Sequence, residues 1–192
     1  MRLGIFGGSF NPPHIGHLIV AERVRESVLL DKILFVPAAV PPHKGTVDLV
    51  DAQHRLTMVQ LAIKDNPFFE TCDCEVKRGG ISYTIETIRE LKAYYPGNEF
   101  HLIIGLDNFL GFHRWRDPEA ILAEVTLIVM DRPGSNESAN TSPYVDRALF
   151  VEVPLIEISA SMIREKVKSG ESIRYMVPRD VEEYIYSQSL YR

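Results

Sequence analysis

The regular alternation of short apolar runs with longer segments of helical spacing is the strongest constraint on the fold. Apolar runs such as residues 32–39 lack the polar alternation of a half-exposed strand, so they predict strands that are buried on both faces. The segments between them repeat apolar residues every three or four positions, which predicts helices. Strands that alternate with helices form a parallel sheet covered by helices on both faces. The sequence therefore predicts an α/β fold with a doubly wound parallel sheet.

The expected elements run from residue 2 to residue 189 with no internal repeat and no low-complexity tract. Asp51 and Ser159 stand where helix N-caps are expected, and Pro96 should end a helix. Because the polar loop at 131–144 lies close between two strands, we expect a single domain, 1–192, with a helical C-terminal portion at about 159–192. Strands are expected at 2–7, 32–39, 68–78, 99–105, 125–130 and 148–153, and helices at 17–30, 51–65, 82–96, 117–124, 159–170 and 178–189.

The bulk composition excludes several classes of protein. The chain has 192 residues and a net charge of -5, which argues against a dedicated nucleic-acid binder with a basic face. No apolar run approaches the ~20 residues of a membrane span, and the first residues do not resemble a signal peptide. We therefore expect a cytoplasmic protein that acts on small molecules, with no nucleic acid and no membrane as partner. Assembly into a homo-oligomer is left open.

The two cysteines are expected to be structural. Cys72, Cys74 and Val76 alternate, so in a strand they would share one face. A metal site would need two more ligands, and none lies nearby in the sequence. We therefore interpret both cysteines as small buried hydrophobic side chains and expect no protein metal site.

The turn after the first expected strand, GGSFNPPHIGH, predicts a phosphate site. Glycines allow the backbone to approach a phosphate, and the following helix begins with unpaired N–H groups. The lysine of the usual phosphate loop is absent, and His14 and His17 stand in its place, three residues apart on one face of a helix. A zinc site at these histidines would lack a third ligand within the turn.

This stretch resembles the H-x-G-H signature of the nucleotidyltransferase superfamily. ISASMIR, residues 158–164, is similar to the I-S-x-[ST]-x-I-R motif of the small adenylyltransferases. Class I aminoacyl-tRNA synthetases share the first signature, but this chain is too short and has no K-M-S-K-S-like segment. The resemblance implies a Rossmann-like nucleotidyltransferase fold. It implies catalytic roles for His14, His17 and Arg164, and ATP binding by Gly7, Gly8, Ser9, Phe10, Gly16, Gly105, Asp107, Ile158, Ser159 and Ser161.

Two middle segments resemble those of bacterial nicotinate mononucleotide adenylyltransferases: RGGISYTIETI, residues 78–88, and GLDNFLGFHRW, residues 105–115. The resemblance implies that Trp115 stacks on a pyridine ring, although a half-buried core tryptophan is the alternative. It also implies that the acceptor nucleotide is bound by Lys44, Ser82, Tyr83, Thr84, Trp115 and Arg132.

The chemistry of several of these residues supports such roles and leaves some alternatives open. Backbone N–H groups at Tyr83 and Thr84 could meet a carboxylate, and Asp107 could accept from a ribose or cap a short helix. Lys44 could reach phosphates or remain a surface charge. Arg55 and Arg78 are interpreted as surface charges.

The implied reaction is transfer of the adenylyl group of ATP to nicotinate mononucleotide, with Mg²⁺ entering with ATP as a cofactor. Nicotinamide mononucleotide and phosphopantetheine are the alternative acceptors. A nucleotide sensor without turnover is the alternative from another class.

Overall fold

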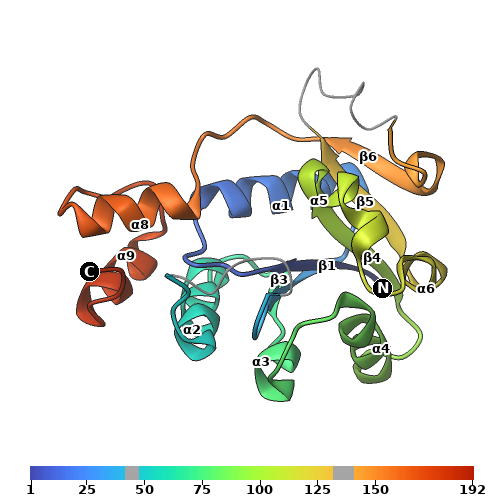
Figure 1. Ribbon diagram of the computed structural model, residues 1–192, viewed down its shortest axis with the longest axis horizontal. Helices are drawn as coiled ribbons and strands as arrows, with labels where there is room; N and C mark the ends of the chain where they lie inside the picture. Colours follow the sequence, from blue (N-terminus) through green and yellow to red (C-terminus); the bar gives the residue numbers. More distant parts are fainter. Residues whose placement is uncertain (42–47, 132–140) are drawn as a thin grey trace. The chain divides into compact units, whose positions relative to one another are not determined.

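A computed structural model describes residues 1–41, 48–131 and 141–192, and its strands form one six-stranded sheet in the order β3-β2-β1-β4-β5-β6 (Figure 1). This order is that of a doubly wound α/β fold, in which the chain starts in the middle and builds outward in both directions. The predicted fold class is confirmed. The strands are β1 (Arg2–Gly8), β2 (Lys32–Pro37), β3 (Phe69–Thr71), β4 (Glu99–Gly105), β5 (Thr126–Asp131) and β6 (Ala148–Glu152).

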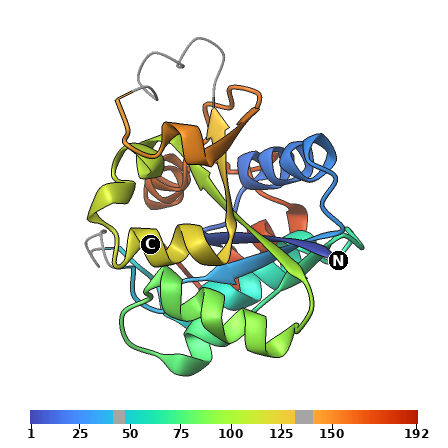
Figure 2. The same ribbon diagram turned by 90° about the vertical axis from the view of Figure 1, so that its right-hand side faces the viewer.

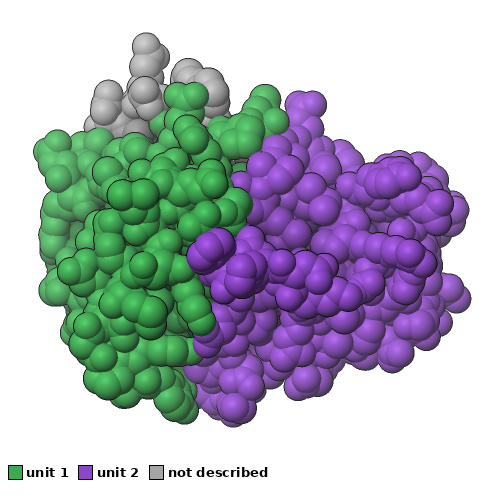
Figure 3. All heavy atoms as spheres, turned by 180° about the vertical axis from the view of Figure 1, so that it is seen from behind, with its two compact units in different colours: residues 1–7, 20–34, 83–155 green, residues 8–19, 35–82, 156–192 purple. Residues whose placement is uncertain are grey.

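The chain divides into two compact units, and its segments alternate between them (Figure 3). Unit 1 comprises residues 1–7, 20–34 and 83–155, and unit 2 comprises residues 8–19, 35–82 and 156–192. The expectation of a single domain stays a prediction. The helices are α1 (Ile15–Ser27), α2 (Ala52–Ile63), α3 (Cys74–Arg78), α4 (Thr84–Tyr94), α5 (Leu106–Leu110), α6 (Pro118–Glu124), α8 (Ala160–Lys168) and α9 (Arg179–Ser187), with short 3-10 helices η1 (Phe112–Arg114) and η2 (Val145–Arg147).

Unit 1 contains the parallel ladder of β1, β4, β5 and β6. β1 pairs with β4 from Arg2 opposite Glu99 to Phe6 opposite Ile103, and β4 and β5 continue the parallel pairing. Helices α1 and α4 lie on opposite sides of these strands (Figures 1 and 2). The centres of the strands are therefore covered on both faces, which explains their uninterrupted apolar sequences.

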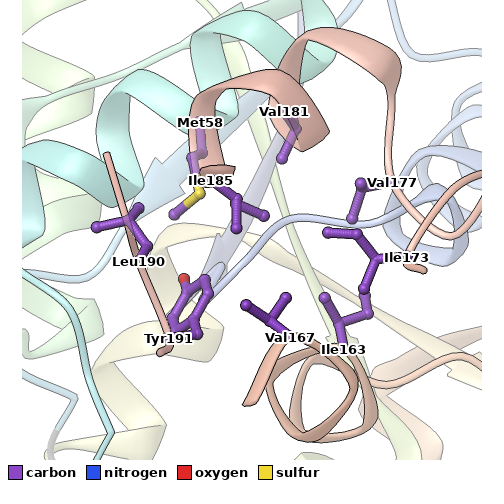
Figure 4. Packing of buried hydrophobic residues seen from close by; sticks show 9 residues of the cluster. All are labelled: Met58, Ile163, Val167, Ile173, Val177, Val181, Ile185, Leu190 and Tyr191. Atoms are coloured by element: carbon purple, nitrogen blue, oxygen red, sulfur yellow. The ribbon is translucent and has the colours of Figure 1, made fainter. Parts of the chain in front are cut away.

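Unit 2 has its own apolar core, built by α2, α8, α9 and the residues around them (Figure 4). α8 and α9 are amphipathic, and each turns its apolar residues toward this cluster. Ser159 caps α8 as predicted, because its Oγ accepts from the Met162 N–H at 3.2 Å. Asp51 caps α2 in the same way, with Oδ1 2.8 Å from the Gln53 backbone nitrogen. The cluster consists of Met58, Ile163, Val167, Ile173, Val177, Val181, Ile185, Leu190 and Tyr191.

The strand predicted at 68–78 is wrong beyond its first residues. β3 ends at Thr71, and Cys74–Arg78 form α3 instead. The charge pattern favours this short helix, because the Asp73 carboxylate lies 3.1 Å from Lys77 Nζ one turn later, and Gly79 ends the helix at φ 69°. The alternation of Cys72, Cys74 and Val76 is therefore not a strand face. Cys74 is buried, and Cys72 is half-buried.

The other expected elements lie within a few residues of their predicted places. The first helix begins two residues earlier than expected, at Ile15, which brings it closer to His14. α5 and η1, between β4 and α6, were not predicted, because each is too short to show a helical period. Over the part of the chain that the structure describes, no helix is long and apolar enough to cross a membrane.

Candidate active site

The turn between β1 and α1 is a mostly buried loop. Phe10 adopts φ 45°, uncommon for a residue with a side chain, and its ring is buried at 2% exposure. A Cβ on Gly8 would lie 3.1 Å from this ring, so a larger residue here would crowd the ring. The Phe10 ring also contacts His17 edge-on, with centroids 5.2 Å apart. Two of the residues predicted to bind ATP differ in exposure. The Phe10 side chain packs inside this turn, whereas Gly7 is exposed at the end of β1.

His14 and His17 are brought together as predicted, with ring centroids 3.7 Å apart. The His14 backbone N–H donates to Nδ1 of His17 at 3.1 Å. Because Nδ1 accepts this bond, the proton of the neutral His17 ring is on Nε2. His17 therefore presents an N–H donor from Nε2, and a backbone amide sets this tautomer.

His14 is more deeply buried than His17, at 7% exposure. Burial lowers the pKa of His14 from 6.5 to about 4, so its imidazole is neutral at physiological pH. Its Nδ1 is buried and has no hydrogen-bond partner among the residues described. A Cβ on Gly16 would lie 3.0 Å from this atom, so glycine leaves room for the ring.

Arg164, from α8, reaches the same loop. Its Nη1 donates to the backbone carbonyl of Asn11 at 3.0 Å, which anchors one edge of the guanidinium. Within residues 1–41, 48–131 and 141–192, its buried Nε finds no hydrogen-bond partner. A guanidinium that is hydrogen-bonded through Nη1 and has no partner at Nε is suited to donate to a phosphate oxygen.

Ser159 and Ser161 stand at the start of α8. Both are exposed, and their hydroxyl oxygens are 3.1 Å apart. Ile158 precedes them and is half-buried. The structure thus gathers His14, His17, Arg164 and the two serines within unit 2, from segments at opposite ends of the printed sequence.

Arg55 was interpreted as a surface charge, and this is wrong: it is 1% exposed. Its guanidinium donates to three backbone carbonyls: Ser9 at 2.9 Å, Ala39 at 2.8 Å and Val50 at 3.0 Å. The arginine is favoured inside because these loop carbonyls have no strand or helix partner, and the guanidinium supplies several donors at once. Arg78, by contrast, is exposed, as expected.

The residues predicted for the acceptor lie around the start of α4. Ser82 is buried and its Oγ accepts from the Ala39 N–H at 2.9 Å, so this hydroxyl supports the loop after β2. Tyr83 is the N-cap of α4, and Thr84 is its first residue. Helix geometry leaves the first N–H groups of α4 without intrahelical partners, as a carboxylate site requires.

Trp115 follows η1 and is half-buried, with its ring 5.2 Å from that of Phe112. This placement is compatible with both readings of Trp115, so its stacking role stays a prediction. Arg116 lies over the Tyr83 ring, 4.5 Å from its centroid, and pairs with Glu86 at 3.0 Å. An arginine is thus fixed beside the N-terminus of α4.

The remaining predicted residues fall into two groups. Gly105 ends β4 and is the N-cap of α5, and Asp107 lies exposed in the first turn of α5. Asp107 is therefore not the cap of this short helix. Lys44 and Arg132 lie outside the described residues.

The donors of this site are not those of a protein metal centre. The described residues contain no group of three or more His, Cys, Asp or Glu side chains that could hold a metal ion. The Arg164 Nε, which has no partner among the described residues, and the neutral His14 imidazole instead fit phosphate oxygens. A divalent ion here would be held by phosphates and water rather than by a protein cage.

Comparison with known proteins identifies the family. Residues 5–166 match the cytidylyltransferase-like family model. Proteins named "Probable nicotinate-nucleotide adenylyltransferase" are 44% identical in Salinibacter ruber, covering 100% of this chain and 98% of the relative, and 43% identical in Oceanobacillus iheyensis, covering 99% and 96%. The chain belongs to the nicotinate-nucleotide adenylyltransferases of this family. It is a nucleotidyltransferase.

The fold agrees with this assignment. The solved Plasmodium falciparum nicotinic acid mononucleotide adenylyltransferase, complexed with NaAD, has a TM-score of 0.79 and 20% identity, and the match covers 99% of this chain and 97% of that one. At this identity the likeness concerns the fold alone. The resemblance given by the sequence motifs is confirmed at the level of family and fold.

Sequence reasoning missed three residues that shape the site: Asn11, Arg55 and Arg116. One signal was present for Arg55, since it precedes Val59 and Ile63 at four-residue intervals and so belongs to the buried face of α2. No local signal marks Asn11 or Arg116, because their partners are distant in sequence.

Arg55→Met is expected to destabilise the protein by roughly 2–4 kcal/mol, because it leaves three buried carbonyls without donors. Arg78→Met is the matched control, since this exposed arginine should change stability by less than about 0.5 kcal/mol. Urea unfolding of both variants and the wild type measures the difference. Equal stabilities for the two variants would contradict the role of Arg55.

The free energy of unfolding should fall as pH drops from about 6.5 to about 4, because unfolded His14 binds a proton that the folded protein excludes. The contribution of neutral His14 to the free energy of unfolding is fully present above the pKa of the unfolded state, about 6.5. It is lost as the pH falls toward the folded pKa of about 4, by on the order of 3 kcal/mol. His14→Gln should remove this part of the pH dependence. Denaturant unfolding of both proteins across this pH range gives the difference in their free energies of unfolding, from which the contribution of the buried His101 cancels. The same pH dependence in both proteins would argue against a neutral His14.

Proposed function

We propose that the protein transfers the adenylyl group of ATP to nicotinate mononucleotide, giving nicotinate adenine dinucleotide and pyrophosphate in the synthesis of NAD. The observation that carries this proposal is the combination of a backbone-fixed Nε2 donor on His17 with an Arg164 guanidinium anchored on Asn11. Neither group is a nucleophile or a strong base. Such a pair suits attack at a phosphorus atom by an acceptor that is already an anion.

The 5′-phosphate of the acceptor attacks the α-phosphorus of ATP in line. A new O–P bond forms, and the bond between the α-phosphorus and the α,β-bridging oxygen breaks with release of pyrophosphate. The acceptor phosphate needs no deprotonation, so no general base is required. Catalysis consists of positioning two anions and stabilising the charge on the α-phosphate.

The residues of unit 2 take the phosphates of ATP in this proposal. Nε2–H of His17 donates to an α-phosphate oxygen, where charge develops. Arg164, with the hydroxyls of Ser159 and Ser161, holds the β- and γ-phosphates. His14 remains neutral, so it adds a hydrogen-bonding ring without the cost of a buried charge.

Mg²⁺, as the cation of ATP, would neutralise charge on the triphosphate. Its ligands would be phosphate oxygens and water, because the described residues around His14 and Arg164 offer donors and no cluster of carboxylates.

The residues of unit 1 take the pyridine of the acceptor. Trp115 stacks on the ring, and the N–H groups at the start of α4 bind its carboxylate. Arg116, which lies over Tyr83 and pairs with Glu86, places a guanidinium near this carboxylate. These contacts favour the acid over the amide.

Pyrophosphate release with ATP and each of three acceptors tests the function. Nicotinate mononucleotide should give fast release, and nicotinamide mononucleotide and phosphopantetheine much slower release. His17→Ala should lower kcat by about 10²–10³, the effect of losing one transition-state donor. Faster turnover of phosphopantetheine would reject the pyridine acceptor, and no release with any acceptor would favour a nucleotide sensor.

Trp115→Ala should raise the KM for nicotinate mononucleotide by about tenfold, the loss of one aromatic stacking contact, and leave the KM for ATP nearly unchanged. Trp115→Phe is the matched control, since it keeps a flat aromatic ring and should restore most of the affinity. Initial-rate kinetics with each substrate varied in turn separate the two constants. Equal changes in the two KM values would indicate that Trp115 has only a structural role.

A further inference from the structure

The Tyr191 hydroxyl is a polar group in the otherwise apolar core of unit 2. The residue is 8% exposed, and its ring lies among aliphatic side chains that include Val167 and Leu190 (Figure 4). Burial raises the pKa of Tyr191, although Arg164 and Arg55 pull it in the opposite direction. The phenol is therefore a neutral O–H donor at any physiological pH. A buried hydroxyl is normally hydrogen-bonded, and its partner shows which part of the chain it holds in place.

That partner is Asn11, in the loop that carries the two histidines. Tyr191 donates to Oδ1 of Asn11 at 2.9 Å. The same oxygen accepts from the Val50 N–H at 3.3 Å, and Nδ2 of Asn11 donates to the Asp48 carbonyl at 2.8 Å. The partners fix the amide orientation, because two of them are donors and one is an acceptor. Asn11 itself is 5% exposed, so its side chain is held on all sides.

The backbone of Asn11 in turn holds Arg164. Its carbonyl accepts from Nη1 at 3.0 Å, so the position of the Asn11 peptide sets where the guanidinium is anchored. The hydrogen bonds thus run from Tyr191 through Asn11 to Arg164, all within unit 2.

We propose that Tyr191 is a positioning residue for the triphosphate: its hydroxyl holds Asn11 so that Arg164 is anchored where the β- and γ-phosphates bind. This inference rests on the proposed assignment of Arg164 to those phosphates. Tyr191 does not touch the nucleotide. Its effect appears only with ligands that reach Arg164.

Tyr191→Phe tests this, because it keeps the buried ring and removes only the hydroxyl. Calorimetric titration with ATP and with AMP, in the absence of any acceptor, separates β- and γ-phosphate binding from the rest of the nucleotide. The variant should bind ATP about tenfold more weakly, the effect of about 1.4 kcal/mol, and bind AMP as the wild type does. Thermal melting checks that the variant is folded.

Tyr184→Phe is the matched control. This tyrosine lies in α9, packs against the same core, and donates or accepts a hydrogen bond at 2.9 Å with His54 Nδ1, away from Asn11. Its removal should leave the affinities for ATP and AMP unchanged. A second test combines Tyr191→Phe with Arg164→Ala, and in that background the loss of the hydroxyl should have no further effect on ATP affinity.

The possible results are distinct. Equal losses for ATP and AMP, or an unchanged ATP affinity in the folded Tyr191→Phe variant, would overturn the positioning role. A wild type that binds ATP no better than AMP would overturn it as well, since no β- and γ-phosphate site would exist. A wild type that binds ATP as expected but releases no pyrophosphate with nicotinate mononucleotide would reject only the proposed acceptor.

Discussion

The Arg55 guanidinium joins three loops of unit 2. It donates to carbonyls of Ser9, Ala39 and Val50, which belong to the turn after β1, the turn after β2 and the segment before α2. Loops at the carboxyl ends of strands need such partners, because their own polar groups cannot pair in a ladder. The positions of His14 and His17 depend on the first of these loops. The buried cation therefore supports the loop that carries the two histidines.

The pattern of strands and helices was predictable because burial on both faces and helical periodicity are local properties of the sequence. The two failures have different causes. Cys72, Cys74 and Val76 alternate like a strand, but Asp73, Lys77 and Gly79 carry the helix signals that prevail. Arg55 looks like a surface charge until the three carbonyls that it satisfies are known. Tertiary hydrogen bonding, which no local pattern contains, decided its burial.

The candidate site divides in the same way. The motifs at His14, His17 and Arg164 are short and specific, so sequence was sufficient to bring them together. Their chemical states were not predictable. The tautomer of His17 depends on one backbone N–H, and the neutral state of His14 depends on burial. Asn11 has no individual signature, because what matters is its contact with residues 39, 37 and 180 positions away.

The hydrogen bonds around Asn11 also couple folding to ligand binding. Residues 11, 48–50, 164 and 191 all belong to unit 2, and Tyr191 is part of its apolar core. Local opening of α9 would release Tyr191 and, with it, the anchor of Arg164. By thermodynamic linkage, a nucleotide that binds Arg164 stabilises the folded state of α9. This stabilisation equals the binding free energy that the nucleotide loses when α9 opens locally. Under the proposed role of Tyr191, the affinity for the triphosphate and the local stability of α9 are therefore thermodynamically coupled.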